Sequence, residues 1–216
     1  MDEASPAARN VLVVGGSGLL GGHAALRLKE AGYGVTIASR TRPAKGPLSE
    51  LPFIKLNYID DPVSPEFFAP FDALVFAAGN DYRHVPDDAE SAAHWEHANS
   101  VAVPAFFEKA RDGGIEVAVL IGSFYPQAAP SLLDDPYVAS RLRADEGVRA
   151  LNGDSFRVVV LNAPYVIGIV PGLDVTQNDV FSRWAAGGWD RIPRFMVKGG
   201  VNVISTDTLS DAIIGA

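Results

Sequence analysis

The chain of 216 residues contains no cysteine. This absence excludes disulfide bonds, cysteine-ligated metal sites and a cysteine nucleophile. Long apolar runs are missing as well, since none approaches the roughly 18 residues that a membrane span needs. The first ten residues, MDEASPAARN, lack the basic and apolar regions of a signal peptide. These absences lead us to expect a cytoplasmic protein with no membrane partner.

Positive charge is scarce too, because 18 Lys and Arg residues face 26 Asp and Glu residues and leave a net charge of −8. A nucleic-acid partner would favour a basic face, so this balance argues against one. His84, His94 and His97 are the candidate metal ligands, but a solvated helix face explains them better, and we predict no metal site. The hydrophobic content of 48% is that of an ordinary globular protein.

Short apolar segments alternate with helical segments along most of the chain. Strands are expected at 11–14, 35–38, 53–56, 73–77, 117–121 and 156–161, and helices at 19–31, 88–111 and 136–151. This alternation predicts an α/β fold with a doubly wound parallel (Rossmann) sheet covered on both faces. We expect residues 1–163 to form the dinucleotide-binding domain. Residues 164–216 should form a small C-terminal substrate lobe, short enough to suggest a truncated or unusually compact version.

A glycine-rich motif directly follows the first expected strand and opens a helix. Gly15, Gly18 and Gly21 have the spacing G-x-x-G-x-x-G. In a dinucleotide site the first glycine makes the tight turn, the second lets the backbone approach a pyrophosphate, and the third lets helix and strand pack closely. The helix N-terminus offers free N–H groups to the phosphates. The predicted cofactor contacts in this loop are Gly15, Ser17, Gly18, Leu19, Leu20 and Gly21.

The end of the second expected strand lacks an acidic residue. An NAD site places Asp or Glu there to bind the ribose 2′-hydroxyl. This chain has Ser39 and Arg40 instead, with Arg42 nearby. Arginine binds phosphate bidentately, so these residues suit a 2′-phosphate. The sequence therefore favours NADP(H) over NAD(H).

A candidate catalytic group follows the fifth expected strand. Ser123 ends that strand, and Tyr137 and Arg141 lie four residues apart at the start of the next helix, on one helix face. A nearby cation lowers the pKa of a tyrosine by favouring the phenolate. The tyrosine hydroxyl could then exchange a proton with a substrate oxygen that Ser123 also contacts, while a nicotinamide exchanges the hydride.

These motifs resemble those of the extended short-chain dehydrogenase/reductase superfamily, the NAD(P)-dependent epimerase/dehydratase-like proteins. The resemblance covers the chain from Asn10 to its end and rests on Gly15–Gly21, Ala73–Ala78, Gly122-Ser123, Tyr137-x-x-x-Arg141, Leu161–Pro164 and Ile204–Ala212. It implies that Ser123 and Tyr137 form the catalytic pair and that Asn99 supports the proton relay. It also implies that Ala77, Ala78 and Pro164 line the cofactor site, with Tyr137 and Arg141 contacting the cofactor as well.

Three positions depart from the family pattern. Arg141 stands where the family motif Tyr-x-x-x-Lys has lysine, and arginine keeps the charge but not the shape. Tyr58 stands where an acidic residue usually lies near the adenine, with Asp60 and Asp61 slightly displaced. Asn162 replaces the arginine common before the proline that follows the sixth strand. The chain is thus a divergent relative of the family.

The sequence predicts an NADP(H)-dependent oxidoreductase or epimerase-like enzyme that acts on a carbonyl or hydroxyl group of a small organic substrate. An NADP(H)-binding protein without turnover, such as a redox sensor or scaffold, is the alternative, and Arg141 and the short second lobe favour it. The resemblance also implies a homodimer through a four-helix interface. Apolar residues beyond one helix face support this, namely Val101, Val103, Phe106 and Phe107.

Overall fold

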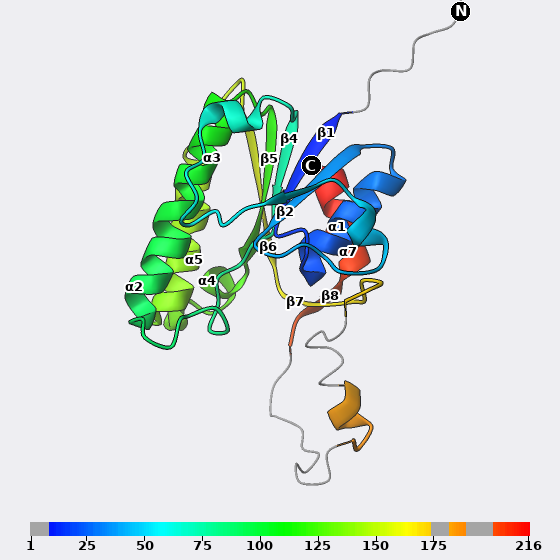
Figure 1. Ribbon diagram of the computed structural model, residues 1–216. Coiled ribbons are helices and arrows are strands. Elements are labelled where there is room, and N and C mark those ends of the chain that lie inside the picture. Colours follow the sequence, from blue (N-terminus) through cyan, green and yellow to red (C-terminus); the bar gives the residue numbers. More distant parts are fainter. Residues whose placement is uncertain (1–8, 174–181, 189–200) are drawn as a thin grey trace, which may run out of the picture.

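The computed structural model describes residues 9–173, 182–188 and 201–216 (Figure 1). Its centre is a six-stranded, fully parallel sheet in the order β3-β2-β1-β4-β5-β6. The strands are β1 (Asn10–Val14), β2 (Gly34–Ser39), β3 (Phe53–Lys55), β4 (Ala73–Phe76), β5 (Val117–Ser123) and β6 (Arg157–Ala163). The predicted doubly wound Rossmann sheet is confirmed, because short apolar segments joined by helical crossovers can pair only in this parallel way.

Helices cover both faces of the sheet, as Figure 1 shows. One face carries α1 (Leu19–Glu30) and the C-terminal helix α7 (Thr206–Ile214). The other carries α2 (Ser91–Trp95), the π-helix η3 (Glu96–Val101), α3 (Ala102–Asp112) and α5 (Pro136–Arg149). Short elements complete this part of the chain: η1 (Pro47–Glu50), η2 (Pro65–Phe68), α4 (Tyr125–Ala128) and η4 (Pro130–Leu132).

Alternate residues of each central strand face opposite halves of the core. Leu12 and Val14 of β1 belong to the cluster beneath α3 and α5, whereas Val11 and Val13 belong to the cluster beneath α1 and α7. The strands are apolar throughout because both faces of a parallel sheet are buried.

The long helix predicted at 88–111 is present as one continuous helical run from Ser91 to Asp112, and its middle segment is π-helical. Glu90 caps α2 by accepting from the N–H groups of Ala92 and Ala93. Between α2 and α3 the chain adopts the π-helix η3. Pro104 has no N–H to offer to the carbonyl of Ser100, and this missing hydrogen bond is the physical reason for an irregular turn here.

The four apolar residues cited for a dimer interface lie in this region, and most of them serve the subunit core. Val103, Phe106 and Phe107 are buried, where Phe106 packs edge-on against Phe68 at a ring distance of 5.2 Å. Only Val101 of the four is exposed, at 52%. These helices are therefore apolar beyond one face mainly because they pack against the sheet and the neighbouring helices of the same chain.

After Pro164 the described chain forms a two-stranded parallel sheet from β7 (Tyr165–Ile167) and β8 (Val203–Ser205). Helix α7 then packs against α1, where Arg27 forms an ion pair with Asp211 at 3.0 Å. Residues 174–181 and 189–200 of the predicted small lobe lie outside the described residues. Across the described ranges, no helix is long and apolar enough to cross a membrane.

Candidate active site

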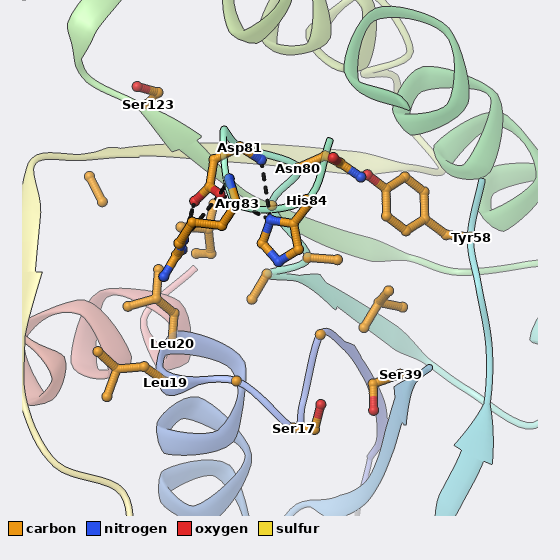
Figure 2. Close-up of a pocket in the computed structure, with 18 of the residues that line it drawn as sticks. Ser17, Leu19, Leu20, Ser39, Tyr58, Asn80, Asp81, Arg83, His84 and Ser123 are labelled. Carbon is orange, nitrogen blue, oxygen red and sulfur yellow. Dashed lines mark hydrogen bonds and ion pairs between the residues drawn. The ribbon is translucent and has the colours of Figure 1, made fainter. Parts of the chain in front are cut away.

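A cavity of about 700 Å³ lies at the carboxyl ends of the central strands (Figure 2). The sheet order reverses between β1 and β4, and ligands of open α/β sheets bind at such a switch point. Most of the predicted site residues line this cavity: Gly15, Ser17, Gly18, Leu19, Leu20, Ser39, Arg40, Ala77, Ala78, Ser123, Tyr137, Arg141 and Pro164. The fold thus brings together segments as distant in the sequence as Gly15 and Pro164.

The glycine-rich loop forms the floor of the cavity, and its three glycines meet different constraints. Gly15 has φ +83°, and a Cβ there would lie 2.6 Å from the backbone nitrogen of Ala78. At Gly21 a Cβ would lie 2.5 Å from the carbonyl oxygen of Gly15, so this residue permits the close contact of helix and turn. At Gly18 the nearest atom would be 3.4 Å away, because this glycine faces the cavity. The loop is therefore a cradle that a side chain at Gly18 would fill.

One end of the cavity is formed by the end of β2 and the turn after β3. The Ser39 hydroxyl donates to the carbonyl of Thr41 at 2.9 Å, and the exposed Arg40 lines the cavity. Arg42 points elsewhere: its guanidinium lies 5.4 Å from the ring centre of Phe53 and is not part of the lining. Of the two arginines in this turn, only Arg40 is thus available to a ligand in the cavity.

Tyr58, which stands where an acidic residue was expected near the adenine, lines the cavity together with Asn57. Asn57 lines the cavity, while Asp60 accepts a hydrogen bond from its side chain at 2.6 Å and Asp61 accepts one from its backbone N–H at 2.7 Å. Neither aspartate lines the cavity. Tyr58 packs edge-on against Phe76 at 4.9 Å, and burial raises its pKa to about 12. Asn57 therefore adds a polar side chain to this corner beside Tyr58, and the sequence analysis missed it.

Tyr137 lies at the other end of the cavity, at the start of α5. Asp135 caps this helix by accepting from the N–H groups of Tyr137 and Val138. The centre of the Tyr137 ring lies 5.1 Å from that of Tyr82 and 5.6 Å from that of Trp95, and these ring contacts fix its position. Ser123 reaches the same cavity from the end of β5, and its hydroxyl has no hydrogen-bond partner within the described parts of the chain.

The electrostatic environment of Tyr137 differs from the expected one. Burial raises the pKa of Tyr137, and the nearby Arg141 lowers it only in part. The prediction that the cation would give a lowered pKa was therefore wrong in its net effect, because desolvation disfavours the phenolate more than Arg141 favours it. Arg141 also donates from Nη2 to the carbonyl of Ile121 at 2.9 Å. The Arg141 guanidinium thus interacts both with Tyr137 and with a backbone carbonyl near the end of β5.

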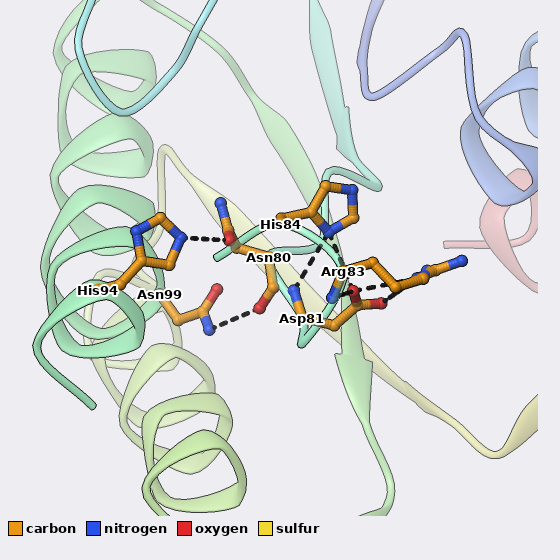
Figure 3. A network of polar contacts seen from close by, with 6 residues as sticks. All are labelled: Asn80, Asp81, Arg83, His84, His94 and Asn99. Atoms are coloured by element: carbon orange, nitrogen blue, oxygen red, sulfur yellow. Dashed lines mark hydrogen bonds and ion pairs between the residues drawn. The ribbon is translucent and has the colours of Figure 1, made fainter. Parts of the chain in front are cut away.

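Asn99 lies behind the cavity wall rather than in it (Figure 3). The side chain is 2% exposed and belongs to the π-helix η3. Its Nδ2 donates to the carbonyl of Asn80 at 3.1 Å and to the Ser140 hydroxyl at 3.0 Å, and that hydroxyl donates to the carbonyl of Tyr137. Asn99 therefore ties the loop after β4 to the helix that carries Tyr137.

The loop between β4 and α2 contributes residues that the sequence analysis did not assign to the site. Asn80, Asp81, Arg83 and His84 all line the cavity, and His94 holds the Asn80 side-chain oxygen at 2.7 Å (Figure 3). The position of this loop at the carboxyl end of a central strand was the available signal. Within the described ranges, no group of three His, Asp or Glu residues is placed to hold a metal ion.

Comparison with known proteins agrees with this geometry. A model of the NAD dependent epimerase/dehydratase family matches residues 11–186. None of the curated proteins compared with the chain matches it in sequence. Among solved structures, the fold is similar to that of UDP-glucose-4-epimerase from Stenotrophomonas maltophila with bound NAD and formylated UDP-arabinopyranose, with a TM-score of 0.74 and 18% identity over 95% of this chain and 72% of that one.

Two further solved structures share this fold. UDP-glucose 4-epimerase from Thermotoga maritima with UDP-glucose gives a TM-score of 0.72 at 18% identity, over 95% of this chain and 72% of that one. The NAD-dependent NDP-hexosamine 5,6-dehydratase TunA, involved in tunicamycin biosynthesis, gives a TM-score of 0.70 at 17% identity, over 95% of this chain and 71% of that one.

The family model spans most of the sequence, and it covers both the glycine-rich loop and the Tyr137–Arg141 pair. The chain therefore belongs to the NAD dependent epimerase/dehydratase family.

Proposed function

We propose that the protein is an NADP(H)-dependent oxidoreductase or epimerase-like enzyme that acts on a carbonyl or hydroxyl group of a small organic substrate. The observation that carries this proposal is the single cavity shared by the glycine-rich loop, Ser123 and Tyr137. A dinucleotide fits this cavity, because Gly18 leaves the loop open where a Cβ would otherwise intrude. When bound, the nicotinamide supplies or accepts the hydride.

Tyr137 is the proton donor of the proposed reaction. Its raised pKa keeps the hydroxyl protonated at neutral pH, which suits donation to a carbonyl oxygen that is being reduced. The open hydroxyl of Ser123 donates a second hydrogen bond to the same oxygen. Arg141 offsets part of the cost of the phenolate that remains, and Asn99 holds the helix in place from behind.

We infer a preference for NADP(H) from the end of β2. Arg40 lines the cavity there, and the residues of this turn that line it include no acid to bind a ribose 2′-hydroxyl. NADPH should bind at least tenfold tighter than NADH, a difference of about 1.4 kcal/mol. Arg40→Asp should reverse the preference. Titration of the unmodified protein by NAD(P)H fluorescence tests this, and equal affinities would remove the assignment.

Oxidation of NADPH against a panel of aldehydes and ketones tests the enzymatic proposal. Turnover that is lost in Tyr137→Phe supports it. Epimerisation consumes no net NADPH, so interconversion of hydroxyl substrates is followed separately by product analysis. A protein that binds NADPH but neither reduces the panel nor interconverts such substrates would instead support the second candidate, a binding protein without turnover. Arg141 favours that second candidate, because arginine keeps the charge of the family's lysine but not its shape, and its Nη2 also donates to the carbonyl of Ile121.

We also propose a homodimer through the α2–α3 and α5 surface, where Val101 is an exposed apolar side chain. Light scattering at micromolar concentration should give twice the monomer mass of 22.9 kDa. Val101→Glu should shift the protein toward monomer, and a monomeric mass for the unmodified chain would rule the dimer out.

A further inference from the structure

The loop between β4 and α2 carries charged side chains to which the proposed function assigns no role, although the Asp81 carboxylate helps to raise the pKa of Tyr137. Asp81 accepts from the Nε of Arg83 at 3.1 Å and from its Nη2 at 2.6 Å. The Nδ1 of His84 lies 3.0 Å from the same carboxylate. All three residues line the cavity, so a ligand there meets this ion pair directly (Figure 3).

The opposite wall of the cavity offers N–H groups but no cation. Residues 15–22 carry no charged side chain, and the first-turn N–H groups of Leu19 and Leu20 have no intrahelical partner. Figure 2 shows Arg83 extending from its loop toward the side of the cavity where these two leucines lie. Of the other guanidinium groups in the lining, Arg141 donates to a strand carbonyl and Arg40 lies at the end of β2. Among the described residues that line the cavity, Arg83 is thus the cation that faces the start of α1.

We propose that Arg83 binds the diphosphate of the dinucleotide, and that Asp81 is the partner it exchanges for phosphate oxygens. The diphosphate would then lie between the start of α1 and the guanidinium, with N–H donors on one side and a planar cationic fork on the other. This inference rests on the proposed function, because it takes a dinucleotide as the ligand.

Exchanging the Asp81 carboxylate for phosphate oxygens as the partner of Arg83 requires little free energy. The Arg83 side chain is 61% exposed and that of Asp81 24%, so solvent screens the arginine end of the pair and the pair contributes only modestly to stability. The Asp81 carboxylate stays in place without the guanidinium, because it also accepts from the backbone N–H of Arg83 at 2.9 Å. A doubly charged diphosphate therefore competes for Arg83 against a carboxylate that need not move.

Two substitutions that both break the ion pair should have opposite effects on binding. Arg83→Met removes the cation, so ADP-ribose and NADPH should bind about tenfold more weakly, the scale of a lost charge-assisted hydrogen bond. Asp81→Asn removes the competitor and keeps the oxygen that accepts from the Arg83 N–H, so binding should tighten by about threefold, as expected for an exposed pair. A pair that only stabilises the loop would weaken binding in both variants.

Isothermal titration with ADP-ribose, NADPH and inorganic pyrophosphate gives the required affinities. Arg111→Met is the matched control, since Arg111 pairs with Asp112 at 2.8 Å outside the cavity lining and should leave all affinities unchanged. In the Arg83→Met background, Asp81→Asn should tighten binding less than it does alone. Effects of equal sign, or no loss in Arg83→Met, would overturn the proposal. A change confined to the KM of a substrate would assign Arg83 to a substrate anion and also overturn it.

These titrations do not depend on turnover, so the two proposals can fail separately. Opposite effects on ADP-ribose binding in a protein without turnover would uphold the role of Arg83 and reject the enzymatic function. Turnover with NADPH together with unchanged affinities in both variants would uphold the enzymatic function and reject the role of Arg83. A protein that binds neither ADP-ribose nor pyrophosphate would reject the role of Arg83.

Discussion

Replacement of Tyr137 by phenylalanine removes one hydroxyl from the cavity and little else. The ring should keep its contacts with Tyr82 and Trp95, which involve the aromatic face and edge. The lost hydroxyl interacts with Arg141, so the free energy of unfolding should fall by no more than about 0.5–1.5 kcal/mol, the net value of one hydrogen bond. The variant should therefore fold and bind NADPH almost as the unmodified protein does.

Turnover should respond much more strongly than stability. Loss of a general acid typically costs about 10²-fold in rate or more, which corresponds to roughly 2.7 kcal/mol of activation free energy at 1.36 kcal/mol per tenfold. The loss should appear in kcat, with the KM for the substrate and the affinity for NADPH little changed. Steady-state assays of NADPH oxidation and thermal unfolding of both proteins give these quantities.

The pH profile adds a second measurement on the same residue. Burial raises the pKa of Tyr137 above its ordinary value of 10.0, so the protonated donor persists through neutral and mildly alkaline pH. Reduction should be independent of this group at neutral pH and should fall only as the pH approaches the raised pKa. Tyr33→Phe, a partly buried tyrosine that packs beside α1 and outside the cavity lining, is the control. Undiminished kcat in Tyr137→Phe would refute the assignment, whatever the pH profile of the unmodified protein.

Three further predictions follow from the same geometry. Gly15→Ala should destabilise the fold by about 2 kcal/mol or more, because the φ of +83° at Gly15 is left-handed and the added Cβ would lie 2.6 Å from a backbone nitrogen. Gly18→Ala should melt within a few degrees of the unmodified protein yet bind NADPH poorly. Equal melting temperatures of the two variants would contradict this prediction. Burial raises the pKa of Tyr58 to about 12, so its contribution to stability is complete below the unfolded-state pKa of about 10 and is lost as the pH rises through 12. Urea unfolding measures the free energy of unfolding at about pH 9 and about pH 11. Between these two values Tyr58→Phe should lose less of that free energy than the unmodified protein does. Arg141→Ala should raise the pKa of Tyr137 further and move the alkaline limb of the rate profile upward, whereas Arg141→Lys should keep or raise activity; an unmoved limb in Arg141→Ala would show that the cation does not act on the tyrosine.

The sequence by itself determined the parallel sheet and the glycine-rich loop. Strand-length apolar runs that alternate with helical segments have one efficient way to bury both sheet faces. Two of the three glycines are constrained by the backbone around them, since the turn at Gly15 and the helix contact at Gly21 admit no side chain. The family membership implied by these motifs is confirmed, because they lie within the region that the family model matches.

The tertiary structure decided what surrounds the predicted site residues. The direction of the Tyr137 pKa depends on burial beneath Tyr82 and Trp95, which are distant in sequence, and no local pattern could supply that desolvation. The position of Asn99 behind the cavity wall depends on its hydrogen bonds to the Asn80 carbonyl and the Ser140 hydroxyl. The sequence analysis assigned no role to Asp81 and Arg83. The pair became part of the site only because parallel strands bring their carboxyl ends to one edge, where the loop that carries it faces the start of α1.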